Sequence, residues 1–356
     1  MNNKELIIEL KENRILGKDD FKQLLTTLAK DEEEFLYETA RKVREDIYGK
    51  DVYIRGLIEF TNYCRNDCAY CGIRASNKNA LRYRLTKEEI MECAALGHEL
   101  GFRTFVMQGG EDMYFTDEHM CEIISGIKAA FPDSAVTLSV GERERETYQR
   151  YFDAGADRFL LRHESITPEH YAFLHDNKMN IDSRVRCLND LKDIGFQVGC
   201  GIMVGSPGQN VENLVNDLIF INEFKPHMVG MGPFIPHNET PFKSEPAGSL
   251  EDTLHMLAIV RLMLPEVLLP ATTALGTLVP TGRELGILAG ANVVMPNLSP
   301  ISVREKYKLY DGKICTGEEA AECLGCLSRR IESTGCKIAL VRGDHKSVKR
   351  KKDNIK

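Results

Sequence analysis

Short apolar runs alternate with longer amphipathic stretches along most of this sequence, and that alternation predicts an α/β protein. Eight of the runs have the length and composition of buried strands. They cover residues 52–60, 104–107, 135–140, 157–162, 197–204, 228–232, 267–273 and 291–295. The stretches between them are long enough for the crossover helices that parallel strands need. We therefore predict a closed (β/α)8 TIM barrel, with an open doubly wound sheet as the alternative.

Segments outside the barrel pattern divide the chain into four parts. Apolar positions recur at helical spacing from Leu6 to Ile47, which predicts a helical N-terminal extension. A C-terminal segment follows the last predicted strand, and the chain then reaches the basic run HKSVKRKK, which is typical of a solvated terminus. The predicted parts are the helical extension (1–50), the barrel (51–300), the C-terminal segment (301–340) and a basic tail expected to be disordered (341–356).

Composition and charge exclude several classes of protein. With 43% hydrophobic and 28% charged residues, the chain has the make-up of a globular protein with a large core. A formal net charge of -7 argues against a nucleic-acid partner, which would call for a clustered basic surface. The N-terminus has no unbroken apolar run of the kind that forms a signal peptide or a membrane span. We expect a cytoplasmic protein that binds neither nucleic acid nor membrane.

Eleven cysteines in a chain without an export signal favour metal chemistry or reduced thiols over disulfides. Six of them form two groups of three, which are Cys64, Cys68 and Cys71, and Cys315, Cys323 and Cys326. The other five stand alone in helical or strand-like patterns and are expected to be structural. These are Cys93, Cys121, Cys187, Cys200 and Cys336.

The first group, Cys64, Cys68 and Cys71, has C-x3-C-x2-C spacing directly after the first predicted strand. Three thiolates are too few for a structural zinc site, and the following 20 residues contain no further Cys or His. A 4Fe-4S cluster held by three cysteines explains the shortage, because its fourth iron then keeps a position for a small ligand. The spacing predicts such a cluster.

The C-terminal ends of the predicted strands are mostly polar or glycine. The strands are followed by Gln108 to Asp112, Gly141 and Glu142, His163 and Glu164, Gly205 to Gly208, Pro233 and Phe234, and Pro296 and Asn297, and the seventh ends in Thr272 and Thr273. In a (β/α)8 barrel the C-terminal strand ends meet at one rim, which is where active sites lie. We expect the cysteine loop and these residues to form one site.

With Tyr70 before Cys71, the cysteine loop reads C-x3-C-x2-aromatic-C and resembles the signature of the radical S-adenosylmethionine (SAM) superfamily. The resemblance implies an enzyme in which SAM chelates the open iron. One electron from the reduced cluster would cleave SAM to methionine and a 5'-deoxyadenosyl radical, so that the cofactor performs the difficult step.

A narrower resemblance, from about residue 52 to about residue 330, is to the HydE family of FeFe-hydrogenase maturases. The strings that carry it are RGLIEFTNYCRNDCAYCGIR, QGGED, LLRHE, MVGSPGQ, MVGMGPFIPH, PATTALGT and GANVVMPN. One departure is Gly109, where the family pattern has serine after the second strand. The lost hydroxyl bears on SAM contacts and leaves the cluster ligands untouched.

The resemblance implies which residues contact SAM. They are Tyr70, Gln108, Gly109, Gly110, Glu111, Ser139, Arg162, Glu164, Arg184 and Met228. Glu164 would bind the ribose, Arg162 and Arg184 would neutralise the carboxylate, and Met228 would lie near the cluster, although core packing alone also explains a methionine there. The strand end GIMVGSPG would pack against adenine.

The second cysteine group, Cys315, Cys323 and Cys326, lies beyond the last predicted strand with C-x7-C-x2-C spacing. By the same resemblance it would hold an accessory iron-sulfur cluster, either 2Fe-2S or 4Fe-4S. A set of exposed thiols is the alternative, because three ligands without a clear fourth make a labile site.

The resemblance also implies the substrate and the partners. The substrate would be an organometallic iron species carrying CO, cyanide and cysteine, received from the maturase HydG, and the product would pass to HydF. An electron donor is also required. Thr272, Thr273, Tyr307 and Tyr310, with Arg158 or Arg162, could hydrogen-bond an anionic ligand. Two alternatives stay open, a methylornithine synthase-like mutase acting on an amino acid and a non-catalytic iron-sulfur carrier.

Overall fold

The computed structural model describes residues 1–317 and 320–348 of the 356-residue chain. Six parallel strands form one sheet in sequential order, β2 to β7. They are β2 (Gly56–Thr61), β3 (Thr104–Gly109), β4 (Ala135–Ser139), β5 (Arg158–Leu160), β6 (Gln197–Val204) and β7 (Met228–Pro233). A second sheet has the order β8 (Val293–Val294), β1 (Asp51–Ile54) and β9 (Lys337–Ala339).

Single bridging contacts join the two sheets into the barrel that the sequence predicts. Leu57 pairs with Asn297 on one side, and Met228 with Leu268 and Pro270 with Val293 on the other. The expected strand 52–60 is split into β1 and β2, and the expected strand 267–273 makes only these bridges, because Pro270 has no N–H to donate to a regular ladder. Strand β9 was not predicted.

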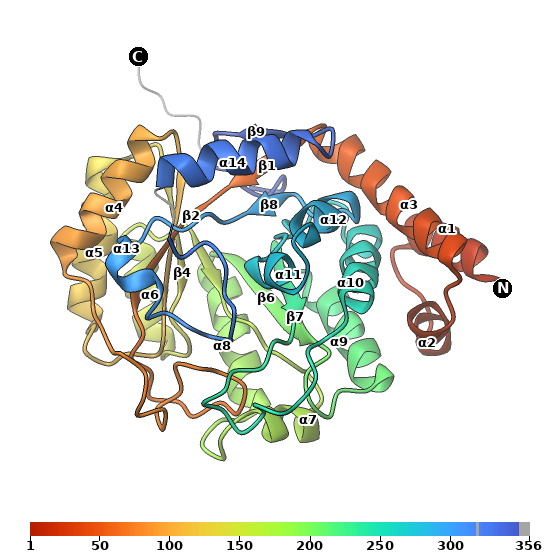
Figure 1. Ribbon diagram of the computed structural model, residues 1–356, viewed down its shortest axis with the longest axis horizontal. Coiled ribbons are helices and arrows are strands. Elements are labelled where there is room, and N and C mark those ends of the chain that lie inside the picture. The colour runs from red at the N-terminus through yellow and green to blue at the C-terminus, as the bar shows by residue number, and fades with distance from the viewer. Residues whose placement is uncertain (318–319, 349–356) are drawn as a thin grey trace.

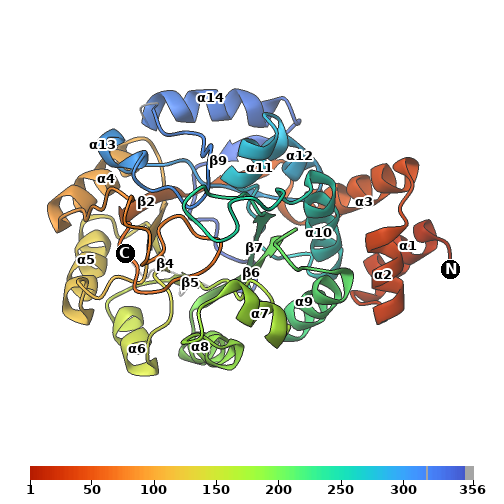
Figure 2. The same ribbon diagram turned by 60° about the horizontal axis from the view of Figure 1, so that its bottom comes forward.

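Helices surround the strands (Figures 1 and 2). Those around the barrel are α4 (Lys87–Glu99), α5 (Asp117–Ala130), α6 (Arg145–Asp153), α7 (Pro168–Leu174), α8 (Ile181–Ile194), α9 (Val211–Phe224), α10 (Leu250–Met263), α11 (Thr273–Leu278), α12 (Gly282–Leu288), α13 (Ile301–Arg304) and α14 (Ala320–Glu332). None of the described helices is long and apolar enough to cross a membrane.

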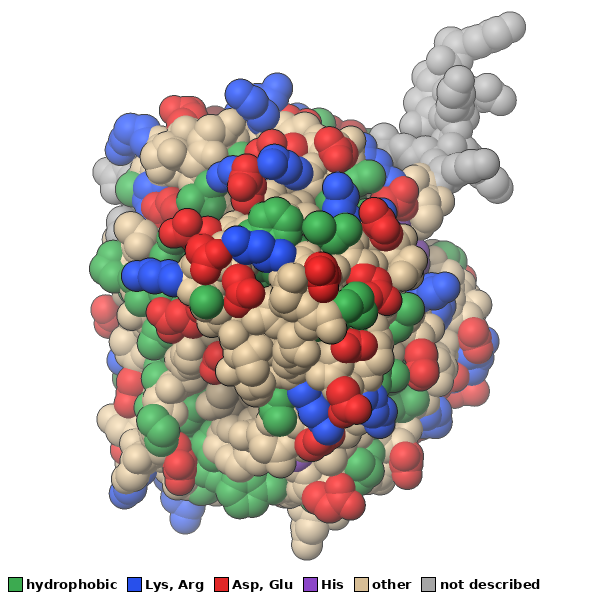
Figure 3. Space-filling view, turned by 90° about the vertical axis from the view of Figure 1, so that its right-hand side faces the viewer, with side chains coloured by type: hydrophobic (Ala, Val, Ile, Leu, Met, Phe, Trp, Pro, Cys, Tyr) green, Lys and Arg blue, Asp and Glu red, His purple; other side chains and the backbone are tan. Residues whose placement is uncertain are grey.

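The N-terminal extension consists of α1 (Asn3–Asn13), α2 (Lys18–Thr26) and α3 (Lys30–Tyr48). Asn2 and Glu5 form a reciprocal cap at the start of α1. Helix α10 is buried from Thr253 to Met263 because α3 and α1 cover the side that faces away from the barrel. The outer face of the extension carries interspersed acidic and basic side chains (Figure 3).

Side chains alternate between two environments along the strands, as the pleat requires. One set, including Phe60, Phe105 and Ile202, belongs to the core that the strands share with the helices. The alternate set faces the barrel axis. In β6 and β7 this set is mostly glycine (Gly199, Gly201, Gly230 and Gly232), so this wall of the barrel carries few side chains.

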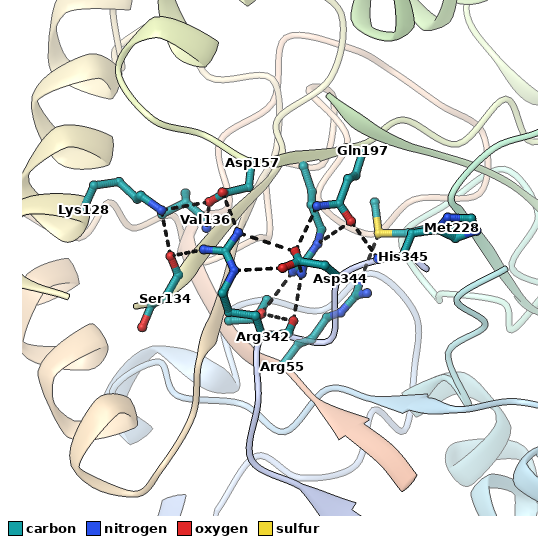
Figure 4. A network of polar contacts seen from close by, with 12 residues as sticks. Arg55, Lys128, Ser134, Val136, Asp157, Gln197, Met228, Arg342, Asp344 and His345 are labelled. Atoms are coloured by element: carbon teal, nitrogen blue, oxygen red, sulfur yellow. Dashed lines mark hydrogen bonds and ion pairs between the residues drawn. The ribbon is translucent and has the colours of Figure 1, made fainter. Parts of the chain in front are cut away.

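The N-terminal strand ends are closed by residues 342–345, which follow the C-terminal segment (Figure 4). Asp344 contacts Arg158, the first residue of β5, at 2.5 Å, and Arg342 contacts Asp157 at 2.7 Å. The Gln197 amide donates to Asp344 at 2.9 Å. Residues 342–345 therefore pack against the barrel, which corrects our expectation of a disordered tail from residue 341, whereas residues 346–348 are exposed and residues 349–356 lie outside the described residues.

We expect Asp344→Asn to lower the free energy of unfolding by about 3–5 kcal/mol, because it leaves Arg158 as a fully buried charge with a weakened partner. Burial alone would raise the pKa of Asp344, but Arg158 and Arg342 outweigh it and hold the pKa below its usual value. A depressed pKa stabilises the fold above the unfolded pKa of about 3.9 and loses that effect as the pH falls. Urea titrations at neutral and acidic pH should show the difference shrinking in acid.

The matched control is Asp31→Asn, which removes an exposed ion pair with Lys4 and should change the urea midpoint very little. If Asp344→Asn unfolds at the same urea concentration as the unchanged protein, the contacts of residues 342–345 do not stabilise the barrel.

Candidate active site at the open end of the barrel

Cys64, Cys68 and Cys71 lie half-buried in the loop that follows β2, at the C-terminal end of the barrel. Burial and, next, the neighbouring cysteines raise the pKa of Cys68 well above its usual value, and burial with Cys64 raises the pKa of Cys71 to about 12. The three thiols therefore lie close enough to interact. Free, they would stay protonated at neutral pH, and bound iron would displace the protons.

No three His, Cys, Asp or Glu side chains in the described part of the chain converge closely enough to hold one metal ion. This fits the donor set, because the thiolates of a 4Fe-4S cluster bind three different iron atoms and lie farther apart than the ligands of a single ion. The residues present fit a cluster better than zinc.

Arg82 fixes the shape of the cysteine loop. Its guanidinium donates to the carbonyl of Asn62 and to those of Ile73 (2.8 Å), Arg74 (2.6 Å) and Asn77 (3.0 Å). Backbone bonds of a loop that is not helix or strand need such partners when they are buried. One side chain thus holds both ends of the segment that carries the three cysteines.

Three backbone hydrogen bonds tie the same loop to other elements. The Arg65 N–H donates to the carbonyl of Glu111, the Ala69 N–H to Leu174 at the end of α7, and the Gly72 N–H to Leu309. Their lengths are 3.0, 2.9 and 2.8 Å. These bonds fix the loop against the end of β3, the end of α7 and the segment after α13.

Two glycines allow the close packing around the loop. A Cβ atom on Gly110 would lie 2.1 Å from the carbonyl oxygen of Tyr63 and 2.7 Å from Cβ of Cys64. Gly141 has a φ of 77°, and a Cβ there would lie 2.1 Å from the Glu111 side chain. Neither position can take a larger residue without moving its neighbour.

A chain of charged groups crosses the rim from β3 to α8. Glu111 accepts from the side chain of Arg65 and from the N–H of Glu142, both at 3.0 Å. Glu142 in turn accepts from Arg184 at 2.6 Å, and Arg184 also donates to the carbonyl of Arg162 at 2.5 Å. Arg184 is buried, so its charge is held near the rim rather than in solvent.

Glu164 has a left-handed backbone, with a φ of 60°, which costs a non-glycine residue of order 1–3 kcal/mol. Its carboxylate lies 2.9 Å from the guanidinium of Arg162. That contact lacks the geometry of a hydrogen bond, and the same carboxylate oxygen and Nε of Arg162 are buried without a hydrogen-bond partner among the described residues. Buried polar atoms are nearly always satisfied, so these atoms are free to form hydrogen bonds with a polar ligand at the rim.

Two threonine hydroxyls extend this set of unpartnered atoms. Thr137 in β4 and Thr272, which precedes α11, are both on the axis-facing set, and neither hydroxyl has a hydrogen-bond partner in the described structure. A Cβ on Gly232 would lie 2.7 Å from the Thr272 hydroxyl. The lumen therefore holds hydroxyl groups that a ligand can use.

The segment after α13 covers one side of the open end and adds an ion pair there. Lys313 contacts Glu59 of β2 at 2.5 Å and donates to the carbonyl of Tyr307 at 2.9 Å. Asn297 donates to the other oxygen of Glu59 at 2.8 Å. Gln108 of β3 donates to the Tyr307 hydroxyl at 3.3 Å. This segment brings a buried cation and Tyr307 to the rim.

Most of the predicted contact residues lie at this end, and two do not. Tyr70 packs beside His175 with its hydroxyl 3.3 Å from the ring, and Ser139 ends β4 beside Gln108. Met228 begins β7 and Arg158 begins β5, so both lie at the opposite end of the barrel, where Met228 contacts Arg55. Their predicted roles near the cluster and the substrate are wrong.

Sequence reasoning placed Asn297 at the rim but missed its partners Glu59 and Lys313. Glu59 had a signal, because it is a lone acidic residue inside an otherwise apolar strand, and such a residue needs a buried partner. Lys313 lies 254 positions away, and nothing in the local pattern connects it with β2.

The second cysteine group lies on the outside of the barrel, beside α12. Arg283 contacts the sulfur of Cys315 at 2.9 Å, and Cys326 is exposed on α14. Arg330 pairs with Glu284 of α12 at 2.5 Å. This hydrogen bond, and to a smaller extent the charges of Cys326 and Cys315, raise the pKa of Arg330. Cys323 falls on α14, and its side chain lies outside the described residues.

Comparison with known proteins gives the class first. A model of the radical SAM superfamily matches residues 58–221, which include the cysteine loop and the strands up to α9. The barrel and its three-cysteine loop are thus those of a radical SAM enzyme, which cleaves SAM with a 4Fe-4S cluster.

Individual relatives narrow the class. The chain is 44% identical over 342 residues to the [FeFe] hydrogenase maturase subunit HydE of Thermotoga maritima, which covers 96% of this chain and 97% of the relative. It is 31% identical over 326 residues to 3-methylornithine synthase of Methanosarcina barkeri, covering 91% of each. The crystal structure of methylornithine synthase (PylB) superimposes with a TM-score of 0.84 at 30% identity, covering 94% of this chain and 97% of that one. The chain belongs to the HydE family of radical SAM enzymes.

We expect Gly110→Ala to prevent normal cluster assembly, because the new methyl group would push the backbone of Tyr63 and with it Cys64 out of place. Iron and sulfide content and the visible absorbance of the anaerobically reconstituted protein measure this. Gly126→Ala is the control, since its Cβ would meet only the Met91 sulfur at 3.5 Å and α5 should gain helix propensity. Full cluster content in Gly110→Ala would show that this close approach is not needed.

Proposed function

We propose that the protein carries out the HydE step of FeFe-hydrogenase H-cluster maturation. In this step a SAM-derived radical acts on an iron species carrying CO, cyanide and cysteine inside the barrel. The observation that carries the proposal is the set of unpartnered polar atoms, in Arg162, Glu164 and Thr272, below a three-cysteine loop in a chain so similar to HydE of Thermotoga maritima.

Cys64, Cys68 and Cys71 would hold the 4Fe-4S cluster. When bound there with SAM on its open iron, the reduced cluster supplies one electron that cleaves the sulfonium and leaves a carbon radical for the substrate. The rest of the work falls to the protein, which binds SAM, aims its reactive end and keeps water away.

The rim residues suit the polar parts of SAM. The unpartnered carboxylate oxygen of Glu164 would accept hydrogen bonds from ribose hydroxyls. The guanidinium groups of Arg162 and Arg184 would favour the methionyl carboxylate, and Glu111 its ammonium group. Gly109 and Gly110 present backbone to this region without side chains that would occupy it.

The lumen suits an anionic, ligand-bearing iron complex. Lys313 and Arg162 bring cationic groups to the open end, and Thr137 and Thr272 offer free hydroxyls below it. The glycine-lined wall of β6 and β7 leaves backbone rather than side chains next to that space. The N-terminal end of the barrel, which the Arg158–Asp344 ion pair closes, would keep solvent from a reactive radical.

The partners follow from the same proposal. HydG would supply the iron complex, HydF would receive the product, and a separate protein would donate the electron. The outer cysteine group, with Cys315 and Cys326 beside Arg283 and Arg330, would hold an accessory cluster that the main reaction does not require.

A second candidate is an amino-acid mutase like methylornithine synthase, because that relative matches over 91% of the chain and its crystal structure superimposes closely. The higher identity to HydE favours the maturase.

To distinguish the maturase from the mutase, the reduced, reconstituted protein is incubated with SAM and either the iron–CO–cyanide–cysteine complex or L-lysine. We expect 5'-deoxyadenosine formation to rise, and the iron complex to be consumed, only with the first substrate. Formation of methylornithine from lysine would contradict the maturase assignment, and stimulation by neither substrate would contradict both.

We expect Thr272→Val to keep the stability of the protein and its cleavage of SAM, and to slow consumption of the iron complex by about tenfold. Valine has nearly the same shape and removes a hydroxyl that has no protein partner, so only a ligand loses a hydrogen bond. Thr39→Val, on α3, makes the same chemical change away from the lumen and should leave turnover unchanged. Equal turnover in Thr272→Val would remove this hydroxyl from the substrate site.

A further inference from the structure

His163 and Asp217 form a buried pair beside the rim that the reaction as described does not use. Both side chains are fully buried, and Nε2 of His163 lies 3.3 Å from a carboxylate oxygen of Asp217. His163 follows Arg162 in the alternation, so its side chain points away from the axis, toward α9, where its ring packs on Phe220 at 4.8 Å. Neither residue can touch SAM or a substrate in the lumen.

This pair is costly to bury. The contact, which is to Oδ1, does not have hydrogen-bond geometry, and neither Nε2 of His163 nor Oδ2 of Asp217 has a hydrogen-bond partner among the described residues. Apolar side chains of similar size would pack in the same place without that cost. A polar pair in this position therefore needs a reason other than stability.

The contacts of the pair bracket the turn that contains Glu164. At one end, Nδ1 of His163 accepts from the N–H of Gly201 at 3.4 Å. At the other end, Oδ1 of Asp217 accepts from the N–H of Ile166 at 2.6 Å. Between them, the Glu164 N–H donates to the carbonyl of Gly201 at 3.0 Å.

The turn so held has the left-handed backbone of Glu164 at its centre. A non-glycine residue keeps such a backbone only when its surroundings fix it. Backbone bonds from Glu164 to Gly201 and from Ser165 to His163 hold the turn itself, and the side chains of His163 and Asp217 hold its two ends. Without these side chains the turn can relax to an ordinary backbone, and the Glu164 carboxylate would then leave its place beside Arg162.

From these contacts we infer that His163 and Asp217 are positioning residues for SAM, which hold Glu164 in the backbone conformation that directs its carboxylate at the ribose. This inference rests on the proposed function, in which Glu164 binds SAM. Two residues that do not touch SAM thus decide whether the Glu164 carboxylate points toward the ribose.

The test measures SAM affinity by titrating the EPR signal of the reduced, reconstituted cluster. Asp217→Ala removes the acceptor for Ile166 and should raise the dissociation constant of SAM by about 10-fold or more, which is typical when a residue that orients a ligand is lost. Asp217→Asn keeps an oxygen for the Ile166 N–H and should lose less. Glu212→Ala, in the first turn of α9 and paired with Lys22, is the control and should bind SAM normally.

A double-mutant cycle separates positioning from a general loss of structure. If Asp217 acts through Glu164, Asp217→Ala should cost nothing more in a Glu164→Gln background, and the SAM-free EPR signal and iron content should be unchanged in all variants. Unchanged affinity in Asp217→Ala, or losses that multiply in the double variant, would overturn the inference.

Two further outcomes keep this inference distinct from the proposed function. Normal SAM affinity in Glu164→Gln would refute the ribose role of Glu164 and the inference with it, while leaving the cluster chemistry standing. Absence of any SAM effect on the signal of the unchanged protein would refute the proposed function itself. If Asp217→Ala yields too little folded protein, Asp217→Asn and its double variant with Glu164→Gln complete the same cycle.

Discussion

The approach of the cysteine loop to the end of β3 is the constraint on which the open end of the barrel depends. The loop must pass so close to Gly110 that a single methyl group would overlap the carbonyl of Tyr63. That approach places the first cysteine next to the residues after β3 and lets the Arg65 N–H reach Glu111. The chain of charges from Glu111 through Glu142 to Arg184 then follows from the same packing.

Both ends of the barrel bury charged side chains. At the N-terminal end Arg158 meets Asp344 and Arg342 meets Asp157, so that these ions satisfy one another and close the barrel, while Arg55 keeps two nitrogens without hydrogen-bond partners in the described structure. At the C-terminal end Arg162 and Glu164 also keep such atoms. The cysteine loop and the charged residues that follow the strands lie at the C-terminal end, which is where the active sites of (β/α)8 barrels form.

How far the sequence could predict this arrangement depends on the range of the interactions. The cysteine spacing and the strand pattern are local, and most of the strands were predicted, although the first is divided at Arg55, the segment 267–273 makes only single bridges and β9 was not predicted. Met228 was misplaced although its position as the first residue of a predicted strand already put it at the N-terminal end. The position of a residue within its strand decides at which end of the barrel its side chain lies, and the type of residue does not.

Long-range pairs could not be predicted. The basic run near the C-terminus suggested a solvated tail, but Arg342 and Asp344 meet partners that lie 185 and 186 positions earlier. Lys313 and Glu59 are similarly distant. Single-sequence patterns give periodicity and motif, and they do not say which buried charge finds which counter-ion.

The most direct test of the central claim is EPR of the anaerobically reconstituted, dithionite-reduced protein, recorded with and without SAM. If Cys64, Cys68 and Cys71 hold a 4Fe-4S cluster with an open iron, SAM must shift the signal, and 5'-deoxyadenosine must form. A protein that assembles no cluster, or whose signal is the same with SAM, would contradict the account of this site.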